Sequence, residues 1–238
     1  MTPTPGTDAP ITRRSALARL GGLVLAAVTA AGWKLGAPRA AGAETVSCLL
    51  TPEQTEGPYY IANEKVRRDI TERRPGTPLA LRLKVVDAST CRPLKGAMVE
   101  VWHCDVGGLY SGFINGSGGG GGSGPTDKRT FLRGGQRTDA TGTARFKTIY
   151  PGWYRGRTVH IHVKVHVGGN VVHTGQLYFP DRLTDTVYAA TPYSKRPGRD
   201  TRNANDGIYG AGGASSTVRL ARSGSGYVAT LTMGVHRS

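Results

Sequence analysis

The chain has 238 residues, 38% hydrophobic and 20% charged, so it can bury a core and is not disordered throughout. Its net charge of +15 would suit a nucleic acid or another acidic partner. The basic residues are dispersed, however, and no helix-turn-helix or RNA-binding aromatic motif is present, so nucleic-acid binding is not expected.

Residues 1–43 have the features of an export signal rather than of a fold. The pair Arg13-Arg14 precedes an apolar run over residues 20–32, which is shorter than the ~20 residues of a membrane-spanning helix. Ala41-Gly42-Ala43 then offers a cleavage site. The paired arginines are typical of a twin-arginine signal, so we expect the twin-arginine machinery to export the chain. An uncleaved membrane anchor is the alternative.

The mature protein is then a single domain over residues 44–238, without a membrane span. It would be secreted, or lie in the periplasm or outer cell envelope. Removing the signal takes away five basic residues and one acid, which lowers the net charge from +15 to +11. The mature chain is basic, but not extremely so.

Export places the three cysteines in an oxidising compartment, where two of them can pair. Cys48 lies near the mature N-terminus and Cys91 lies in a turn-like stretch, so we expect these two to form a disulfide. Cys104 ends an apolar segment and is expected to be free and buried. Closing a loop of this length stabilises a fold by up to ~4 kcal/mol.

Short segments in which apolar and polar residues alternate predict β-strands along the mature chain. In chain order these are residues 79–86, 97–102, 143–149, 158–167, 171–179, 217–221 and 227–235. Helix signals are poor throughout. The sequence therefore predicts an all-β fold, a sandwich or barrel of mainly antiparallel strands.

Two segments are expected to be irregular. Residues 116–124 contain only Gly and Ser, which is typical of a flexible loop within one domain, with an interdomain linker as the alternative. Residues 181–212 are rich in Asp, Arg, Thr and Pro and are expected to form a long loop around the strands.

The densest chemistry lies around His160 and His162. Because residues two apart on a strand face the same side, these imidazoles project together and could bind a metal, although imidazole does not choose between Zn, Cu, Fe and Ni. Two satisfied core histidines are the alternative. Tyr154 and Tyr110 lie nearby in the predicted arrangement, and residues 150–163 hold no carboxylate. A phenolate at neutral pH needs a hard Lewis acid such as Fe(III).

Three blocks of sequence resemble the intradiol ring-cleavage dioxygenases, and most closely the exported branch of that family. They are Thr55-Glu56-Gly57-Pro58-Tyr59-Tyr60, the stretch from Val99 to Ser111, and the stretch from Phe131 to Val165. The resemblance spans roughly residues 45–180. It implies a β-sandwich with a non-haem Fe(III) site between strands and loops.

The resemblance also implies roles for individual residues. The metal ligands would be Tyr110, Tyr154, His160 and His162, with Tyr150 as an alternative to Tyr154. Tyr154 would also accept a proton from the substrate, Arg157 would stabilise negative charge on it, and Gln176 would help to position it. Pro58 and Tyr59 would contact the substrate. His103 and His166 are expected not to be ligands, and Asp105 is expected to hold the loop that presents Tyr110.

The resemblance therefore implies an exported dioxygenase that uses O₂ to cleave a catechol-type ring between its two hydroxylated carbons, giving a muconate-type diacid. Catechol, hydroxyquinol and protocatechuate are not distinguished, and the oligomeric state is left open. A non-catalytic β-sandwich that binds aromatics or a surface polymer is the alternative; the presence of all four candidate ligands and Arg157 argues against it.

Overall fold

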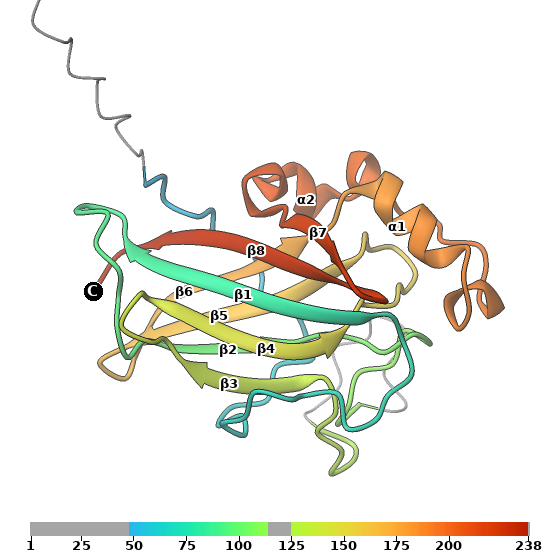
Figure 1. Ribbon diagram of the computed structural model, residues 1–238, viewed down its shortest axis with the longest axis horizontal. Helices are drawn as coiled ribbons and strands as arrows, with labels where there is room; N and C mark the ends of the chain where they lie inside the picture. The colour runs from blue at the N-terminus through green and yellow to red at the C-terminus, as the bar shows by residue number, and fades with distance from the viewer. Residues whose placement is uncertain (1–47, 114–124, 238) are drawn as a thin grey trace, which may run out of the picture. The chain divides into compact units, whose positions relative to one another are not determined.

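A computed structural model describes residues 48–113 and 125–237 of the chain (Figure 1). The expected export signal over residues 1–43 and the whole Gly/Ser segment over residues 116–124 lie outside these residues. Within the described part of the chain, no helix is both long and apolar enough to cross a membrane.

Two four-stranded sheets make up the described fold (Figure 1). The first has the strand order β4-β1-β8-β7, and only β1 and β8 run parallel to each other. Its strands are β1 (Pro78–Asp87), β4 (Thr143–Ile149), β7 (Arg219–Ser223) and β8 (Gly226–Val235).

The second sheet has the order β3-β2-β5-β6, and all of its neighbouring strands are antiparallel. Its strands are β2 (Met98–Trp102), β3 (Arg133–Arg137), β5 (His160–Val167) and β6 (Asn170–Tyr178). The predicted β-sandwich of mainly antiparallel strands is confirmed.

The core lies between the two sheets because apolar residues alternate along the strands. On β1, Leu81 and Leu83 are fully buried, whereas Arg82 and Lys84 point outward. On β5, Ile161 and Val163 join the same core. Burying each such side chain stabilises the fold by roughly 1.5–3 kcal/mol. His160 and His162 alternate with these two residues along β5 and therefore lie on the outer face of the second sheet.

Strand β3 is the one strand that the alternation pattern did not predict. Its centre is Gly134-Gly135, which offers no apolar side chain to signal a strand. A Cβ atom on Gly134 would lie 2.8 Å from the Ile70 side chain and 3.1 Å from the carbonyl oxygen of Lys65, in a segment that bridges to β3 in parallel. Glycine is therefore required by close packing of the backbone and not by a turn.

The expectation of a purely irregular loop over residues 181–212 is wrong in part. Helix α1 (Asp181–Tyr188) and the single turn α2 (Gly207–Gly210) form there, and gather near one end of the sandwich (Figure 1). The 3₁₀ turns Tyr193–Lys195 and Asn203–Asn205 lie in the same region, and a third, Gly213–Ser216, follows it. Arg199 pairs with Asp181 and Asp185 of α1. Such distant ion pairs stabilise a short helix that its own sequence signals only weakly.

Cys48 and Cys91 form the expected disulfide, with their Cα atoms 5.5 Å apart, and Cys104 is a free, buried thiol. The bond ties the N-terminal strap, whose Thr51 donates to Gly234 of β8, to the turn between β1 and β2.

Reducing this disulfide is expected to lower the free energy of unfolding by up to about 4 kcal/mol, because the bond closes a loop with a sequence separation of 43. Urea denaturation with and without reductant measures the effect. The double variant Cys48→Ser/Cys91→Ser should match the reduced protein and respond no further to reductant. Equal midpoints for the oxidised and reduced protein would contradict the prediction.

Candidate functional site

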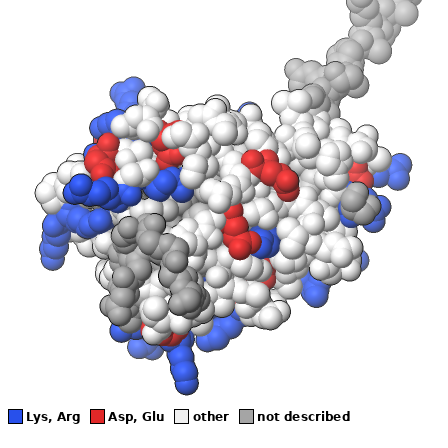
Figure 2. Space-filling model, turned by 180° about the vertical axis from the view of Figure 1, so that it is seen from behind, with Lys and Arg blue, Asp and Glu red and all other residues white. Residues whose placement is uncertain are grey.

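The candidate site lies on the outer face of the second sheet, the side of the molecule that Figure 2 shows. His162, the third residue of β5, pairs in register with Trp102 of β2 and with Gln176 of β6. The Trp102 and His162 rings stack with centroids 5.0 Å apart and planes inclined by 3°. Regular strand pairing therefore fixes both the position and the ring plane of His162.

Two imidazole nitrogens and two phenol oxygens meet at one point. His160 Nε2 lies 3.1 Å from His162 Nε2, 3.2 Å from the Tyr154 hydroxyl and 3.5 Å from the Tyr110 hydroxyl. Tyr110 comes from the loop after β2, and Tyr154 from the loop before β5. The structure thus brings together all four residues that the sequence analysis named as ligands.

Hydrogen bonding determines which histidine nitrogen faces this point. His160 Nδ1 donates to the carbonyl of Thr158 at 2.7 Å, which leaves Nε2 as an unprotonated donor of electrons. Burial, reinforced by Arg157, lowers the pKa of His160 to about 3. Burial beside His160 also holds the pKa of His162 well below its usual value. Both rings are therefore neutral at pH 7, the form that binds metals.

This set of four donors fits a hard cation. Donor atoms about 3 Å apart match neighbouring ligands of one ion at ~2.1 Å. Two buried, neutral imidazole nitrogens that face each other also repel unless a proton or a cation lies between them. Within residues 48–113 and 125–237, no three His, Cys, Asp or Glu side chains gather to hold a metal, so binding here depends on the tyrosines. Fe(III) accepts this mixture of imidazole and phenolate.

Burial keeps both phenols protonated in the absence of a cation. It raises the pKa of Tyr110 well above its usual value. Burial also raises the pKa of Tyr154, although the positive charge of Arg157 opposes this shift. Only a strong Lewis acid at the meeting point would ionise them at neutral pH.

Arg157 lies at the edge of the site, held by two neighbours. Its Nε donates to Asp206 at 2.9 Å and its Nη2 donates to the Gln176 side-chain oxygen at 2.5 Å. Asp206 is buried and also accepts from the Thr158 backbone at 2.8 Å. Burial alone would lower the pKa of Arg157, but Tyr154 and Asp206 raise it above its usual value, so the guanidinium stays charged.

The Gly-Pro block places an aromatic wall beside the site. Tyr59 is buried and stacks on Tyr110 with ring centroids 4.2 Å apart, and its edge approaches Tyr154. Pro58 precedes it and is exposed. A Cβ atom on Gly57, where φ is +72°, would lie 3.1 Å from the His162 ring. Glycine therefore lets this strap pass directly over His162.

Asp105 and Arg133 hold the loop that presents Tyr110. Asp105 Oδ1 accepts from the backbone of Gly107 at 2.9 Å and of Leu109 at 3.0 Å, as the sequence analysis expected of it. Arg133 is 1% exposed and donates to both the side chain and the carbonyl of Ser111, at 2.8 and 2.6 Å.

His103, His166 and the alternative tyrosine, Tyr150, lie away from the meeting point. Tyr150 is in the core between the sheets, where its hydroxyl bonds Thr184 at 2.8 Å. His166 bonds Glu100 at 2.9 Å. His103 is buried with both nitrogens occupied, by the Cys104 carbonyl and the Thr148 hydroxyl.

Sequence reasoning missed the supporting residues Asp206, Arg133 and Trp102. Asp206 lies in the segment expected to be irregular, 49 residues from Arg157, so no local pattern links the two. Arg133 stands in a strand without alternation. Only Trp102 could have been found from the sequence, because it lies at an outward-facing position of a predicted strand.

The buried, neutral His103 makes stability depend on pH. Burial lowers its pKa from 6.5 to about 4, so between these values the unfolded chain binds a proton that the folded chain does not. This contribution to stability is present above pH 6.5 and is lost as the pH falls towards 4. Through His103 alone, lowering the pH from 7 to 5 should cost roughly 2 kcal/mol of unfolding free energy, in addition to the loss from His160 and His162, whose pKa values burial also lowers.

Urea denaturation at pH 7, 6 and 5 measures this loss. His103→Gln should be less stable at pH 7 but show a shallower decline than the unsubstituted protein. A decline of the same slope in both proteins would show that His103 is not the titrating group.

Comparison with known proteins gives matches over most of the described chain. Residues 55–196 match the sequence profile of the family described as Dioxygenase. An intradiol ring-cleavage dioxygenase structure from Tetranychus urticae is 37% identical, with a TM-score of 0.76, and covers 80% of this chain and 96% of that one. The dioxygenase domain of a dioxygenase–carbohydrate-binding fusion from Streptomyces sp. SirexAA-E is 30% identical, with a TM-score of 0.59, covering 80% and 100%.

Curated relatives match over shorter stretches. Catechol 1,2-dioxygenase 1 of Acinetobacter lwoffii is 32% identical over 111 residues, which are 44% of this chain and 32% of the relative. A chlorocatechol 1,2-dioxygenase of Cupriavidus pinatubonensis is 28% identical over 155 residues, 55% and 56% of the two chains. The chain thus spans between about a third and just over half of the length of these relatives.

Proposed function

The chain belongs to the intradiol ring-cleavage dioxygenase family, and from this premise we propose that it cleaves a catechol-type ring between its two hydroxylated carbons. The products would be muconate-type diacids that carry both atoms of O₂. The observation that carries the proposal is the convergence of His160, His162, Tyr110 and Tyr154 on one buried point beside Arg157.

In this proposal His160, His162, Tyr110 and Tyr154 hold a non-haem Fe(III). The ion would supply the Lewis acidity that ionises phenols and the capacity to accept electron density from the diol. The two neutral imidazoles fit that ion because they can bind it without losing a proton. The two phenols fit it because they become strong, hard donors once ionised.

The chain's own residues then position and stabilise the substrate. Tyr154 Oη, once ionised, would be the base that accepts one proton of the diol, because it lies 3.2 Å from His160 Nε2, where the diol would bind. The Arg157 guanidinium offers a fixed positive charge to negative charge developing on the ring, and Gln176 holds that guanidinium at 2.5 Å. Tyr59, stacked on Tyr110, and the neighbouring Pro58 line the approach to the ring and exclude water.

We further propose that the protein is exported through the twin-arginine machinery and works as the mature chain from residue 44. The Cys48–Cys91 disulfide supports an oxidising compartment. N-terminal sequencing of the protein recovered outside the cytoplasm tests this, and an intact N-terminus would contradict cleavage.

The activity is tested by oxygen uptake with catechol, hydroxyquinol and protocatechuate, followed by product mass under ¹⁸O₂. One substrate should give a ring-opened diacid containing two ¹⁸O atoms. Arg157→Met should lower kcat/KM by about 10²–10³-fold while iron content is unchanged. Arg155→Met is the matched control, since Arg155 is exposed two residues away. No uptake with any substrate by the iron-loaded protein, or an equal loss in both variants, would overturn the proposal.

A further inference from the structure

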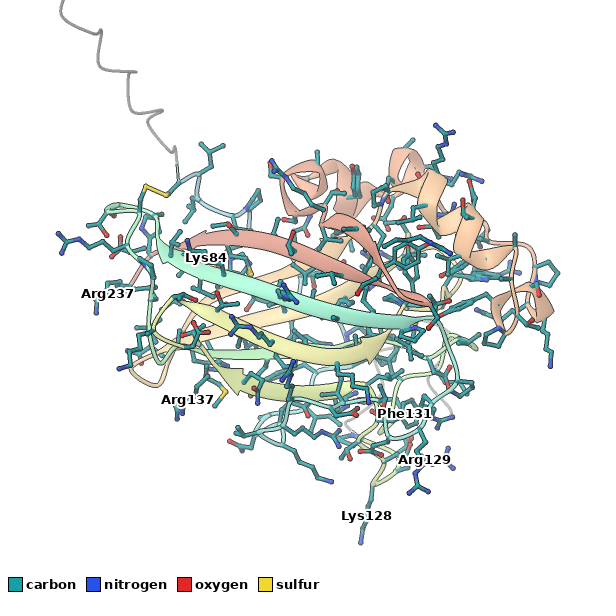
Figure 3. The ribbon with its side chains drawn as sticks, viewed as in Figure 1. Lys84, Lys128, Arg129, Phe131, Arg137 and Arg237 are labelled. Atoms are coloured by element: carbon teal, nitrogen blue, oxygen red, sulfur yellow. A yellow bond between two sulfur atoms is a disulfide. The ribbon has the colours of Figure 1, made fainter. Side chains whose placement is uncertain are left out.

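The outer face of the first sheet, on the opposite side of the sandwich from the candidate site, carries a row of basic side chains. Strand register places Arg145 of β4 opposite Arg82 of β1, Arg82 beside Thr230 of β8, and Thr230 opposite Arg219 of β7. Lys84, two residues after Arg82 on β1, lies on the same face of the sheet (Figure 3). Three arginines therefore share one line across four neighbouring strands.

This row forms part of a groove of about 710 Å³. Ala214, Ser215 and Thr217, which precede β7, line it as well. The groove is lined by Arg82, Lys84, Thr143, Arg145, Ala214, Ser215, Thr217, Arg219, Thr230, Leu231 and Thr232. Four of these side chains are cationic, five carry hydroxyl groups, and none is a carboxylate.

The charges of this groove are largely uncompensated. Arg82 and Arg145 lie directly opposite each other on paired strands. Like charges in such positions repel and destabilise a sheet. Arg145 pairs with Asp139. Among the described residues, Arg82, Lys84 and Arg219 have no ion-pair partner. An anion bound along the row would remove this repulsion.

The lining indicates which kind of anion fits. Arginine forks bind carboxylates and sulfates through paired hydrogen bonds, and the threonine and serine hydroxyls can bond to sugar hydroxyls between them. No aromatic side chain lines the groove, so bases have no surface on which to stack. None of the exposed large apolar residues, which are Leu49, Leu50, Val66 and Val171, lines it either, which disfavours insertion into a lipid surface.

We propose that this groove is a docking site for a linear polysaccharide bearing carboxylate groups. Neighbouring strands lie about 4.8 Å apart, so the row of cationic side chains extends over several strands. A polymer can contact all of these side chains at once, whereas a single small anion cannot. The opposite face of the molecule, shown in Figure 2, bears acidic as well as basic side chains. A polymer in the groove would leave the candidate site on that face open to solution.

The experiment measures the affinity of the full mature protein for polygalacturonate, by titration calorimetry at several salt concentrations. The variant Arg82→Gln/Lys84→Gln/Arg219→Gln should bind at least about tenfold more weakly and with a shallower salt dependence. The control Arg68→Gln/Lys128→Gln/Arg129→Gln loses the same charge from exposed positions outside the groove, two of them labelled in Figure 3. It should bind within about threefold of the unsubstituted protein.

Three results would overturn the proposal. The first is an equal loss of affinity in both triple variants, which would mean that only the net charge matters. The second is the absence of binding at ~0.1 M salt. The third is tighter binding to anionic lipid vesicles or to duplex DNA than to polygalacturonate. Because the measurement needs no turnover, its failure is distinguishable from failure of the proposed dioxygenase activity.

Discussion

Replacing His162 by Ala is expected to abolish binding of the proposed Fe(III), and with it the visible absorption band that tyrosinate-to-Fe(III) charge transfer would produce. His162 Nε2 lies 3.1 Å from His160 Nε2, and both belong to the four converging donors. The His162 ring stacks on Trp102, which fixes its orientation. Loss of an outer-shell partner alone typically costs 10–100-fold in metal affinity, so loss of a ligand should exceed about 100-fold. Iron content per chain and the visible spectrum measure it without reference to turnover.

The same strand offers a matched control. His166 faces the same side of β5 but bonds Glu100, so His166→Ala should keep both the iron and the absorption band. Tyr154→Phe should weaken and shift the band, since Tyr110 would remain as the other phenolate, whereas Tyr150→Phe, a change in the core, should leave the band unchanged. Circular dichroism confirms that each variant is folded. Retained iron in His162→Ala, or a band lost in Tyr150→Phe, would contradict this assignment of ligands.

The alternation of side chains predicted the sandwich because burial has a period of two on a strand. Along β5 this pattern separated Ile161 and Val163, which enter the core, from His160 and His162, which face outward. The two histidines were thus placed side by side by local geometry alone. Their meeting with Tyr110 and Tyr154 could be inferred only from family resemblance, since loops carry no comparable periodicity.

The parts that escaped prediction depend on contacts between distant segments. Strand β3 is held by Arg67, whose backbone donates to Gly135, and by the close approach of Ile70 to Gly134. Asp206 reaches Arg157 across 49 residues and also begins helix α2 by accepting from the Ile208 and Tyr209 backbone. Neither arrangement gives a periodic pattern in the sequence, because each residue is required by particular contacts and not by its position on one face of a strand or helix.

Arg133 shows how such a residue can support the site without touching it. Its guanidinium joins three segments, through the Tyr59 carbonyl at 3.1 Å, the Ser111 carbonyl at 2.6 Å and the Glu64 carboxylate at 2.9 Å. It therefore fixes the backbone beside both Tyr59 and Tyr110, whose rings stack on each other. Burial raises the pKa of Glu64, and the nearby Arg133 charge acts to lower it again.

Arg133→Met is accordingly expected to reduce the free energy of unfolding by about 3–5 kcal/mol, because it leaves the Glu64 carboxyl buried without a partner. Removing the carboxylate as well, in Arg133→Met/Glu64→Gln, should recover much of that loss. It should not restore the backbone contacts at Tyr59 and Ser111, so the iron-dependent absorption band should stay weakened in the double variant.

Urea denaturation and the visible spectrum separate these two effects. Arg137→Met provides the control, since Arg137 lies on the same strand but is exposed, and this variant should change stability by less than about 0.5 kcal/mol. Two outcomes would contradict the argument: a double variant as unstable as Arg133→Met, or one whose absorption band is fully recovered. The first would mean that the buried charge is not the source of the loss, and the second that Arg133 does not position the loop of Tyr110.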